Sequence, residues 1–128
     1  MDKLDSIFQK QAELDKLINQ TKKIQVDKYT PQEWIQKKAL ALIGEVTEVL
    51  DETNYKWWKI NQEFKSDKLK EELVDVLHFL ISMCLTAGLT SEELFAIYMS
   101  KHQENLDRQN GKSKKQGYTN QQTATNNE

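Results

Sequence analysis

The sequence predicts an all-α protein, an antiparallel four-helix bundle that assembles as a homo-oligomer. The 128 residues include only four glycines and one proline, and no alternating strand pattern recurs. Four segments instead place apolar residues at helical spacing between recognisable helix starts and stops. The length suits one domain of ordinary size. We therefore expect a single helical domain over residues 1–111 and a polar, flexible tail over residues 112–128.

The first two predicted helices are separated by a polar link. A helix from about residue 3 to 22 has an apolar face, and an irregular segment follows to about residue 29. Thr30-Pro31-Gln32-Glu33 then combines an N-cap threonine, a proline at the first helical position and a glutamate that can close a capping box. A second helix should therefore run from Pro31 to about residue 52.

The third and fourth predicted helices follow a loop that ends near residue 66. The third helix should span about residues 67–87, with Ser66 or Asp67 as its N-cap and Gly88 at its end. A second capping-box pattern over residues 90–93 opens a helix to about residue 109, which Asn110-Gly111 should close. Low sequence complexity after that point predicts no fixed structure without a ligand.

The third predicted helix carries more large apolar residues than one small bundle can cover. From residue 73 to 85 the chain reads LVDVLHFLISMCL, in which ten of thirteen residues are apolar. A surplus of apolar surface on a small domain indicates burial against another copy. We expect a homodimer, or a tetramer made of two dimers.

Composition excludes some functional classes. A net charge of −2 gives no basic footprint for nucleic acid. The chain has neither a run of 18 apolar residues nor a signal peptide, so no membrane partner is expected. The single cysteine, Cys84, lies in the apolar run and has no partner for an intrachain disulfide. A reducing cytoplasm is the expected setting.

Four carboxylates at two helical i,i+3 spacings carry most of the functional signal. Glu45 and Glu48 lie in one apolar helix, and Glu72 and Asp75 lie in the next. Residues three apart share a helix face, so each pair can present two carboxylates to one point. Buried charges need a cationic partner. Two such helices packed together would form an all-oxygen cage for Mg²⁺ or Mn²⁺.

Two simpler readings stand beside the metal site. An ExxE pair is common on solvated helix faces, where it binds nothing. Alternatively, the carboxylates could form a buried ion-pair network with lysine or arginine. No Lys or Arg lies between Lys70 and Lys101, so the third helix supplies no counter-charge beyond its own start. This gap favours a metal ion.

The loop between the second and third helices mixes aromatic and basic residues. Tyr55, Trp57 and Trp58 are interleaved with Lys56 and Lys59. Aromatic faces stack on nucleobases, and lysines pair with phosphates. The alternative is a hydrophobic loop that folds onto the core.

Polar residues on the last two helices are further candidates. Lys101, Asn105, Arg108 and Gln109 share one face of the fourth helix, which can hold an anion and a polar base edge or can simply be solvated. His78 lies one turn after the second acidic pair, where it can contact substrate or be a satisfied core histidine.

Taken together, these segments resemble the all-α nucleoside-triphosphate pyrophosphatases, which include the MazG-like enzymes and the dimeric dUTPases. The dimeric dUTPase branch is the closer match. Its LQxxLN/D, F-K-x-W, ExVDxxHF, K-x3-N-x2-R-Q and Gly-Tyr segments are similar to residues 11–15, 54–59, 72–79, 101–109 and 117–118, in that order. The resemblance covers about residues 4–118.

This resemblance implies a fold, an activity and a site. The helical domain would be catalytic, and Glu45, Glu48, Glu72 and Asp75 would bind two or three Mg²⁺ ions that bridge the substrate phosphates. Glu45 or Glu48 would orient and deprotonate the attacking water. Attack at the α-phosphorus of dUTP would then yield dUMP and pyrophosphate.

The same resemblance implies the substrate contacts. Phosphate contacts would come from basic side chains and a tyrosine, and contacts to the uracil edge from the amides of Gln11 and Asn105. A tryptophan would stack on the base or close off the sugar, and a histidine could contact the substrate. The implied residues are Gln11, Lys56, Trp57, Trp58, Lys59, His78, Lys101, Asn105, Arg108, Gln109 and Tyr118.

The chain also departs from the dimeric dUTPase pattern. It is shorter than most of that branch, and the spacer before Gly117-Tyr118 is long and rich in lysine. Two alternatives therefore stay open. One is a MazG-like enzyme that acts on other dNTPs, and the other is a helical oligomer that binds nucleotide or metal without turnover.

Overall fold

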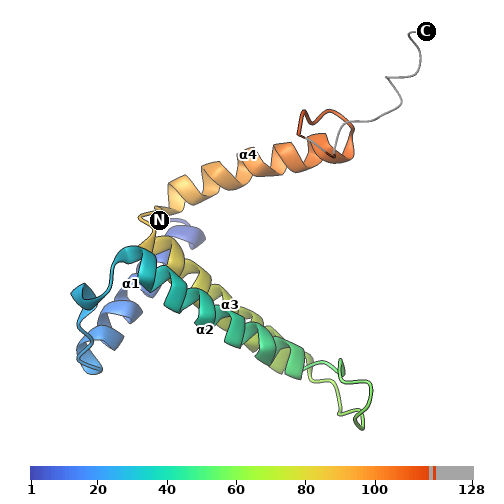
Figure 1. Ribbon diagram of the computed structural model, residues 1–128, viewed down its shortest axis with the longest axis horizontal. Coiled ribbons are helices and arrows are strands. Elements are labelled where there is room, and N and C mark those ends of the chain that lie inside the picture. The colour runs from blue at the N-terminus through green and yellow to red at the C-terminus, as the bar shows by residue number, and fades with distance from the viewer. Residues whose placement is uncertain (116, 118–128) are drawn as a thin grey trace. The chain divides into compact units, whose positions relative to one another are not determined.

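The computed structural model describes residues 1–115 and 117, and these residues form helices and no strands. The helices are α1 (Lys3–Thr21), the 3-10 helix η1 (Val26–Lys28), α2 (Pro31–Asp51), α3 (Ser66–Thr86) and α4 (Ser91–Gln109) (Figure 1). The all-α prediction is confirmed, and each predicted α-helix lies within two residues of an observed one.

Helices α1, α2 and α3 belong to one compact unit, Met1–Ser91. Helices α2 and α3 lie antiparallel and side by side, and α1 packs against α3 (Figure 1). Few side chains are fully buried in this unit. Phe8, Ile81 and Cys84 form its apolar centre, and burial raises the pKa of the Cys84 thiol. The core is therefore thin for a chain of this length.

A second compact unit begins at Glu92 and contains most of α4. The helix ends where Gly111 adopts a φ of 70°, and the Lys112 amide donates to the Asp107 carbonyl at 2.8 Å. Ser113 is buried, and its hydroxyl donates to Glu104 Oε1 at 2.6 Å. The first residues after α4 thus stay tied to the helix.

The helix boundaries test the predicted caps. Thr30 Oγ1 accepts from the Glu33 amide at 3.1 Å, and Glu33 Oε1 accepts from the Thr30 amide at 3.4 Å, which confirms the capping box. Gly88 has a φ of 80° just after α3, where the Leu89 amide donates to the Cys84 carbonyl at 2.9 Å. This 6→1 bond is the Schellman pattern that a glycine at this position permits.

The N-terminus of α3 differs from the prediction. The predicted cap, Ser66 or Asp67, is wrong, because Lys65 is the N-cap and its side chain accepts no hydrogen bond from the helix. Ser66 is instead the first helical residue. Asp67 lies in the first turn, where its negative charge still favours the helix N-terminus.

The link between α1 and α2 is more ordered than the sequence indicated. It contains η1, and Trp34 Nε1 donates to the Val26 carbonyl at 2.8 Å. The Tyr29 and Trp34 rings meet edge to face with centroids 5.3 Å apart. Trp34 therefore ties the link to the start of α2.

Lys23, at the end of α1, gives the first testable prediction. Its φ is 52°, and the next residue, Ile24, donates its amide to the Asn19 carbonyl at 2.9 Å. This left-handed conformation disfavours residues with a Cβ. Lys23→Gly should raise the free energy of unfolding by about 0.5–1 kcal/mol, measured by urea denaturation. Lys22→Gly is the control, because Lys22 has a φ of −89° and should gain nothing.

Large apolar side chains on all four α-helices stay exposed in the single chain. Leu40 on α2 is 69% exposed, Leu73 on α3 is 51% exposed and Phe95 on α4 is 59% exposed. Among the described residues, no helix by itself is long and apolar enough to cross a membrane, although α3 and α4 taken together as a broken pair reach that length and composition. A surface this apolar agrees with the expected assembly of copies.

Candidate active site

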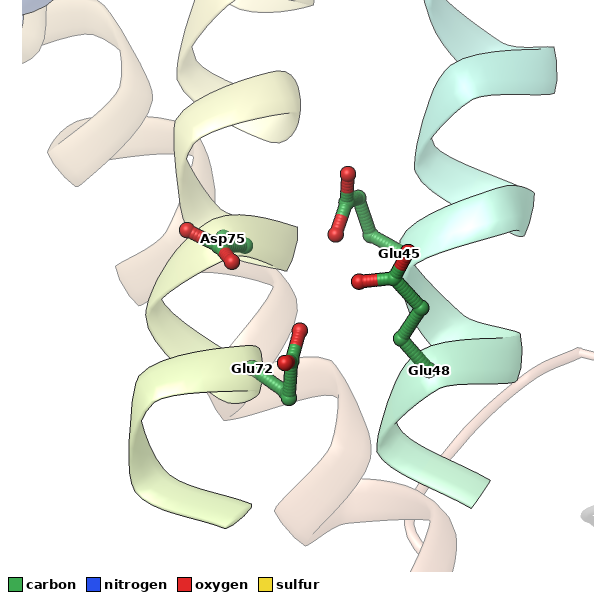
Figure 2. Close-up of side chains that lie close together, drawn as sticks. All are labelled: Glu45, Glu48, Glu72 and Asp75. Atoms are coloured by element: carbon green, nitrogen blue, oxygen red, sulfur yellow. The ribbon is translucent and has the colours of Figure 1, made fainter. Parts of the chain in front are cut away.

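Four carboxylates from two helices converge between α2 and α3. Glu45 and Glu48 come from α2, and Glu72 and Asp75 come from α3. One oxygen from each lies within 4.8 Å of the others. Figure 2 shows the two pairs pointing toward one another across the gap between the helices. The two acidic pairs are separated in the sequence by the loop that joins α2 to α3. The antiparallel packing of these two helices brings the pairs together.

The electrostatics of this cluster favour the binding of a positive charge. Oε2 of Glu45 and Oε2 of Glu72 are buried and accept no hydrogen bond. Burial raises the pKa of Glu72 to about 7, helped by its hydrogen bond to Glu48 and by the neighbouring negative charges. Burial and Glu48 also raise the pKa of Glu45. Mutual repulsion therefore disfavours full ionisation of the cluster.

No lysine or arginine neutralises the cluster within the described residues. The ion pairs in this part of the chain are Lys10–Glu13 and Glu104–Arg108. A buried ion-pair network is therefore not what holds the four carboxylates together. The donor set consists of oxygens alone, and hard divalent cations such as Mg²⁺ and Mn²⁺ prefer such ligands. The orphaned oxygens of Glu45 and Glu72 fit this kind of ion.

The raised pKa of Glu72 predicts how stability depends on pH without metal. In the unfolded chain this carboxyl titrates near 4.5, and in the folded protein near 7. Between these values the folded state keeps a proton that the unfolded state has lost, so the free energy of unfolding falls as pH rises. We expect the melting temperature in EDTA to fall between about pH 5 and about pH 7.5.

Two comparisons check this assignment. Glu72→Gln should flatten the fall in melting temperature, because an amide does not titrate. Mg²⁺ should stabilise the protein more at the higher pH, because metal ligands must be deprotonated. A melting temperature that rises across the window in EDTA would contradict the assignment.

Gln11 and His78 meet at the contact between α1 and α3. Gln11 is 5% exposed, and its Oε1 lies 2.6 Å from Nδ1 of His78. Gln11 Nε2 donates to Asp15 Oδ1 at 2.9 Å, and Ser82 Oγ donates to Asp15 Oδ2 at 2.8 Å. The structure joins two predicted substrate contacts in one polar network, in which Asp15 is an additional member.

The aromatic loop after α2 projects its tryptophans outward. Trp57 is 84% exposed and Trp58 is 61% exposed, and their rings meet edge to face at 4.7 Å. Lys56 Nζ lies 5.6 Å from the centre of the Tyr55 ring. The loop therefore does not fold its tryptophans onto the core, so both remain free to stack on a ligand.

Lys59 lies exposed in the same loop, and the remaining predicted contacts lie on α4 or beyond it. Lys101, Asn105, Arg108 and Gln109 are all on α4, as predicted. Arg108 Nε contacts Glu104 Oε1 at 3.2 Å, and its Nη1 donates to Asn105 Oδ1 at 3.4 Å. Tyr118 lies outside the described residues.

This chain also matches a known protein family. Residues 3–92, which make up most of the chain, match the profile of the dUTPase family. The chain belongs to the dUTPase family. This confirms the resemblance found in the sequence, and the helical fold of this dUTPase-family chain agrees with it.

One curated relative is also similar to this dUTPase-family chain. It is the dCTP pyrophosphatase of Enterobacteria phage T4, 31% identical over 87 residues, which cover 57% of this chain and 51% of the phage protein. The chain thus matches about half the length of that relative. No solved structure matches the chain.

A cavity in this dUTPase-family chain is the main feature that the sequence did not indicate. It has a volume of about 510 Å³ and lies among α1, the η1 segment, α2 and α3. Tyr29, Trp34 and Phe79 line it beside the polar residues Asp15 and Lys38. Residues from all four of these elements line this cavity. The helical spacing from Trp34 to Glu45 was the one available hint, because it puts both residues on the same face of α2.

Proposed function

We propose that this protein is a Mg²⁺-dependent nucleoside triphosphate pyrophosphohydrolase whose favoured substrate is dUTP. The reaction would convert dUTP and water to dUMP and pyrophosphate. The observation that carries the proposal is the four-carboxylate cluster, in which buried oxygens of Glu45 and Glu72 lack any partner. Family membership supports the same activity. Two or three Mg²⁺ ions per site are proposed, with Mn²⁺ as a substitute.

Each carboxylate has a proposed role. Glu45, Glu48, Glu72 and Asp75 would hold the ions. When bound, Mg²⁺ supplies positive charge to the substrate phosphates and lowers the pKa of a nearby water. A carboxylate oxygen of Glu45 or Glu48 would accept the proton of the attacking water. The bond between the α-phosphorus and the bridging oxygen breaks, and pyrophosphate leaves.

The other predicted residues would position the substrate. The exposed Trp57 and Trp58 can stack on the base or close off the 2′ position of the sugar. Basic side chains would hold phosphate oxygens, and Arg108 suits a bidentate contact. The proposed phosphate contacts are Lys56, Lys59, Lys101, Arg108 and Tyr118, with Asn105 and Gln109 as polar contacts. A homo-oligomer in the cytoplasm is proposed as the working form.

A second candidate substrate is dCTP. The phage relative is a dCTP pyrophosphatase that is 31% identical to this chain over 87 residues. The two bases differ in hydrogen bonding, because uracil has an N3–H between two carbonyls and cytosine has an amino group beside an acceptor nitrogen. A polar site that suits one base leaves groups unpaired with the other.

The deciding experiment is a panel of dNTPs and NTPs with Mg²⁺ and a readout of pyrophosphate. We expect kcat/KM for dUTP to exceed that for dCTP, dTTP and UTP by about two orders of magnitude. A dominant rate on dCTP would select the second candidate, and similar rates on all dNTPs would indicate a broad MazG-like enzyme. No pyrophosphate from any nucleotide would indicate a binding protein without turnover.

A further inference from the structure

One side chain closes the base of the loop that joins α2 to α3. Asn54 Nδ2 donates to the Gln62 carbonyl at 3.1 Å, and the Gln62 amide donates to Asn54 Oδ1 at 2.9 Å. A side-chain amide carries the same donor and acceptor as a peptide group, so this exchange resembles one hydrogen-bonded pair between two strands. The two residues are eight positions apart. We call these two bonds the loop clamp.

A tight turn at the tip of the loop presents the two tryptophans. The Lys59 amide donates to the Lys56 carbonyl at 3.0 Å, which is the bond that closes a four-residue turn. Trp57 and Trp58 are the two central residues of this turn, and their rings meet edge to face at 4.7 Å. An aromatic pair thus lies between two lysines, a combination that can stack on a base and contact phosphate.

The loop receives little support from packing. Trp57 is 84% exposed, Ile60 is 88% exposed and Phe64 is 56% exposed. Other hydrogen bonds of the described loop join near neighbours, such as the bond from the Trp57 amide to the Tyr55 carbonyl at 3.1 Å. Bonds of that range do not bring the ends of a loop together. The clamp does, and it offsets part of the entropy that loop closure costs.

The clamp also connects the loop to the helix that carries Glu48. The Glu52 amide donates to the Glu48 carbonyl at 3.3 Å, and the Thr53 amide donates to the Leu50 carbonyl at 2.9 Å. Asn54 follows directly, so it leaves the last turn of α2 in a fixed direction. The clamp therefore fixes the returning strand of the loop relative to the end of α2.

We infer that Asn54 is a positioning residue, which holds the loop in the shape that presents Trp57 and Trp58 before any nucleotide binds. The inference rests on the proposed function, in which these tryptophans and their flanking lysines contact the nucleotide. A preformed loop binds more tightly, because less conformational entropy is lost when the ligand arrives. Asn54 acts through Gln62, since the clamp uses both its amide nitrogen and its carbonyl oxygen.

Nucleotide binding without turnover tests this role. The probes are α,β-imido-dUTP and α,β-imido-dCTP, whose bridging nitrogen resists cleavage at the α-phosphorus. Titration calorimetry of the full chain with Mg²⁺ should show binding of at least one. Asn54→Ala removes both clamp bonds and should weaken that binding about tenfold. Asn54→Asp keeps the acceptor for the Gln62 amide but loses the donor, so its affinity should lie between the two.

Two substitutions in the same loop are matched controls. Asn61→Ala makes the same chemical change in an exposed residue that takes no part in the clamp, and it should leave the affinity unchanged. Gln62→Ala should also bind as the wild type does, because the clamp uses only the main chain of Gln62. In turnover assays, Asn54→Ala should raise KM about tenfold and change kcat by less than about twofold, because the carboxylates are untouched.

Two further measurements follow the clamp itself. Hydrogen exchange of the Gln62 amide should be slow in the wild type and fast in Asn54→Ala. The close Trp57–Trp58 pair should give a coupled circular-dichroism band, which Trp58→Phe assigns by removing it. Asn54→Ala should lose about half of this band or more, while its melting temperature stays within about 2 °C of wild type because the loop is exposed.

The outcomes separate this role from the proposed function. Wild-type affinity in Asn54→Ala would overturn the inference, as would a Gln62 amide that stays protected in that variant. A wild-type protein that binds neither analogue would overturn it too. If the analogues bind as expected but no dNTP yields pyrophosphate, the role of Asn54 stands and the proposed activity fails. If dNTPs yield pyrophosphate with an unchanged KM in Asn54→Ala, the activity stands and the inference fails.

Discussion

Replacing Glu48 with Gln should lower turnover by about a thousandfold or more, and Asp75→Asn should do the same. Both residues contribute to a single cluster whose oxygens lie within 4.8 Å of one another. Groups that hold one set of ions act as a unit, so the double variant should lose little more than either single variant. Steady-state pyrophosphate release from the best dNTP, at saturating Mg²⁺, measures each loss.

A neighbouring carboxylate provides the control for the thousandfold loss. Glu71 lies on α3 directly beside Glu72 but is exposed and outside the cluster. Glu71→Gln should therefore retain activity within about twofold. Excess EDTA should abolish wild-type turnover, and added Mg²⁺ or Mn²⁺ should restore it. Full wild-type turnover in EDTA would refute the metal-dependent mechanism.

The acidic cluster could be predicted because its geometry is mostly local. Each pair is fixed by three-residue spacing within one helix, and a hairpin between consecutive helices is the simplest way to pair them. The capping box at Thr30 and the stop at Gly88 are also local signals, and both are present. The predicted cap of α3 is wrong, because Ser66 and Asp67 lie in the first turn of the helix although both are residue types that favour the N-cap position.

The cavity and its polar network could not be predicted from the sequence. Gln11 and His78 are 67 positions apart, as are Asp15 and Ser82. Their contacts depend on how α1 crosses α3, and residue spacing alone does not fix that crossing. Lys38 looks like an ordinary solvated charge in the sequence, and Asp15 stands out only as the last residue of the segment that resembles LQxxLN/D. The structure shows instead that both line one cavity.

The second large effect expected is loss of assembly when the uncovered face of α3 is charged. On the side of α3 away from the carboxylates, Ile81 and Cys84 are buried, but Leu73, Val74 and Leu77 are 38–52% exposed. Val74 and Leu77 also line a groove of about 380 Å³ with Ile7 of α1. A second copy would cover this apolar strip, and an obligate interface of that kind buries more than about 2,000 Å².

Leu73→Glu combined with Leu77→Glu should convert the assembly to single chains. Two carboxylates would have to be buried without partners in an apolar interface. The free energy of desolvating them exceeds the free energy that the interface contacts contribute. Sedimentation equilibrium at micromolar concentration should give about 30 kDa or more for the wild type, twice the 15.0 kDa of one chain or a higher multiple, and 15.0 kDa for the variant. Ile60→Glu is the matched control, because Ile60 is 88% exposed in the loop after α2 and the substitution should leave the mass unchanged.

A wild-type protein that sediments as a single chain would show that the exposed strip has another use. In that case the thin core around Phe8 and Ile81 would have to support the fold alone, and the melting temperature should not depend on protein concentration.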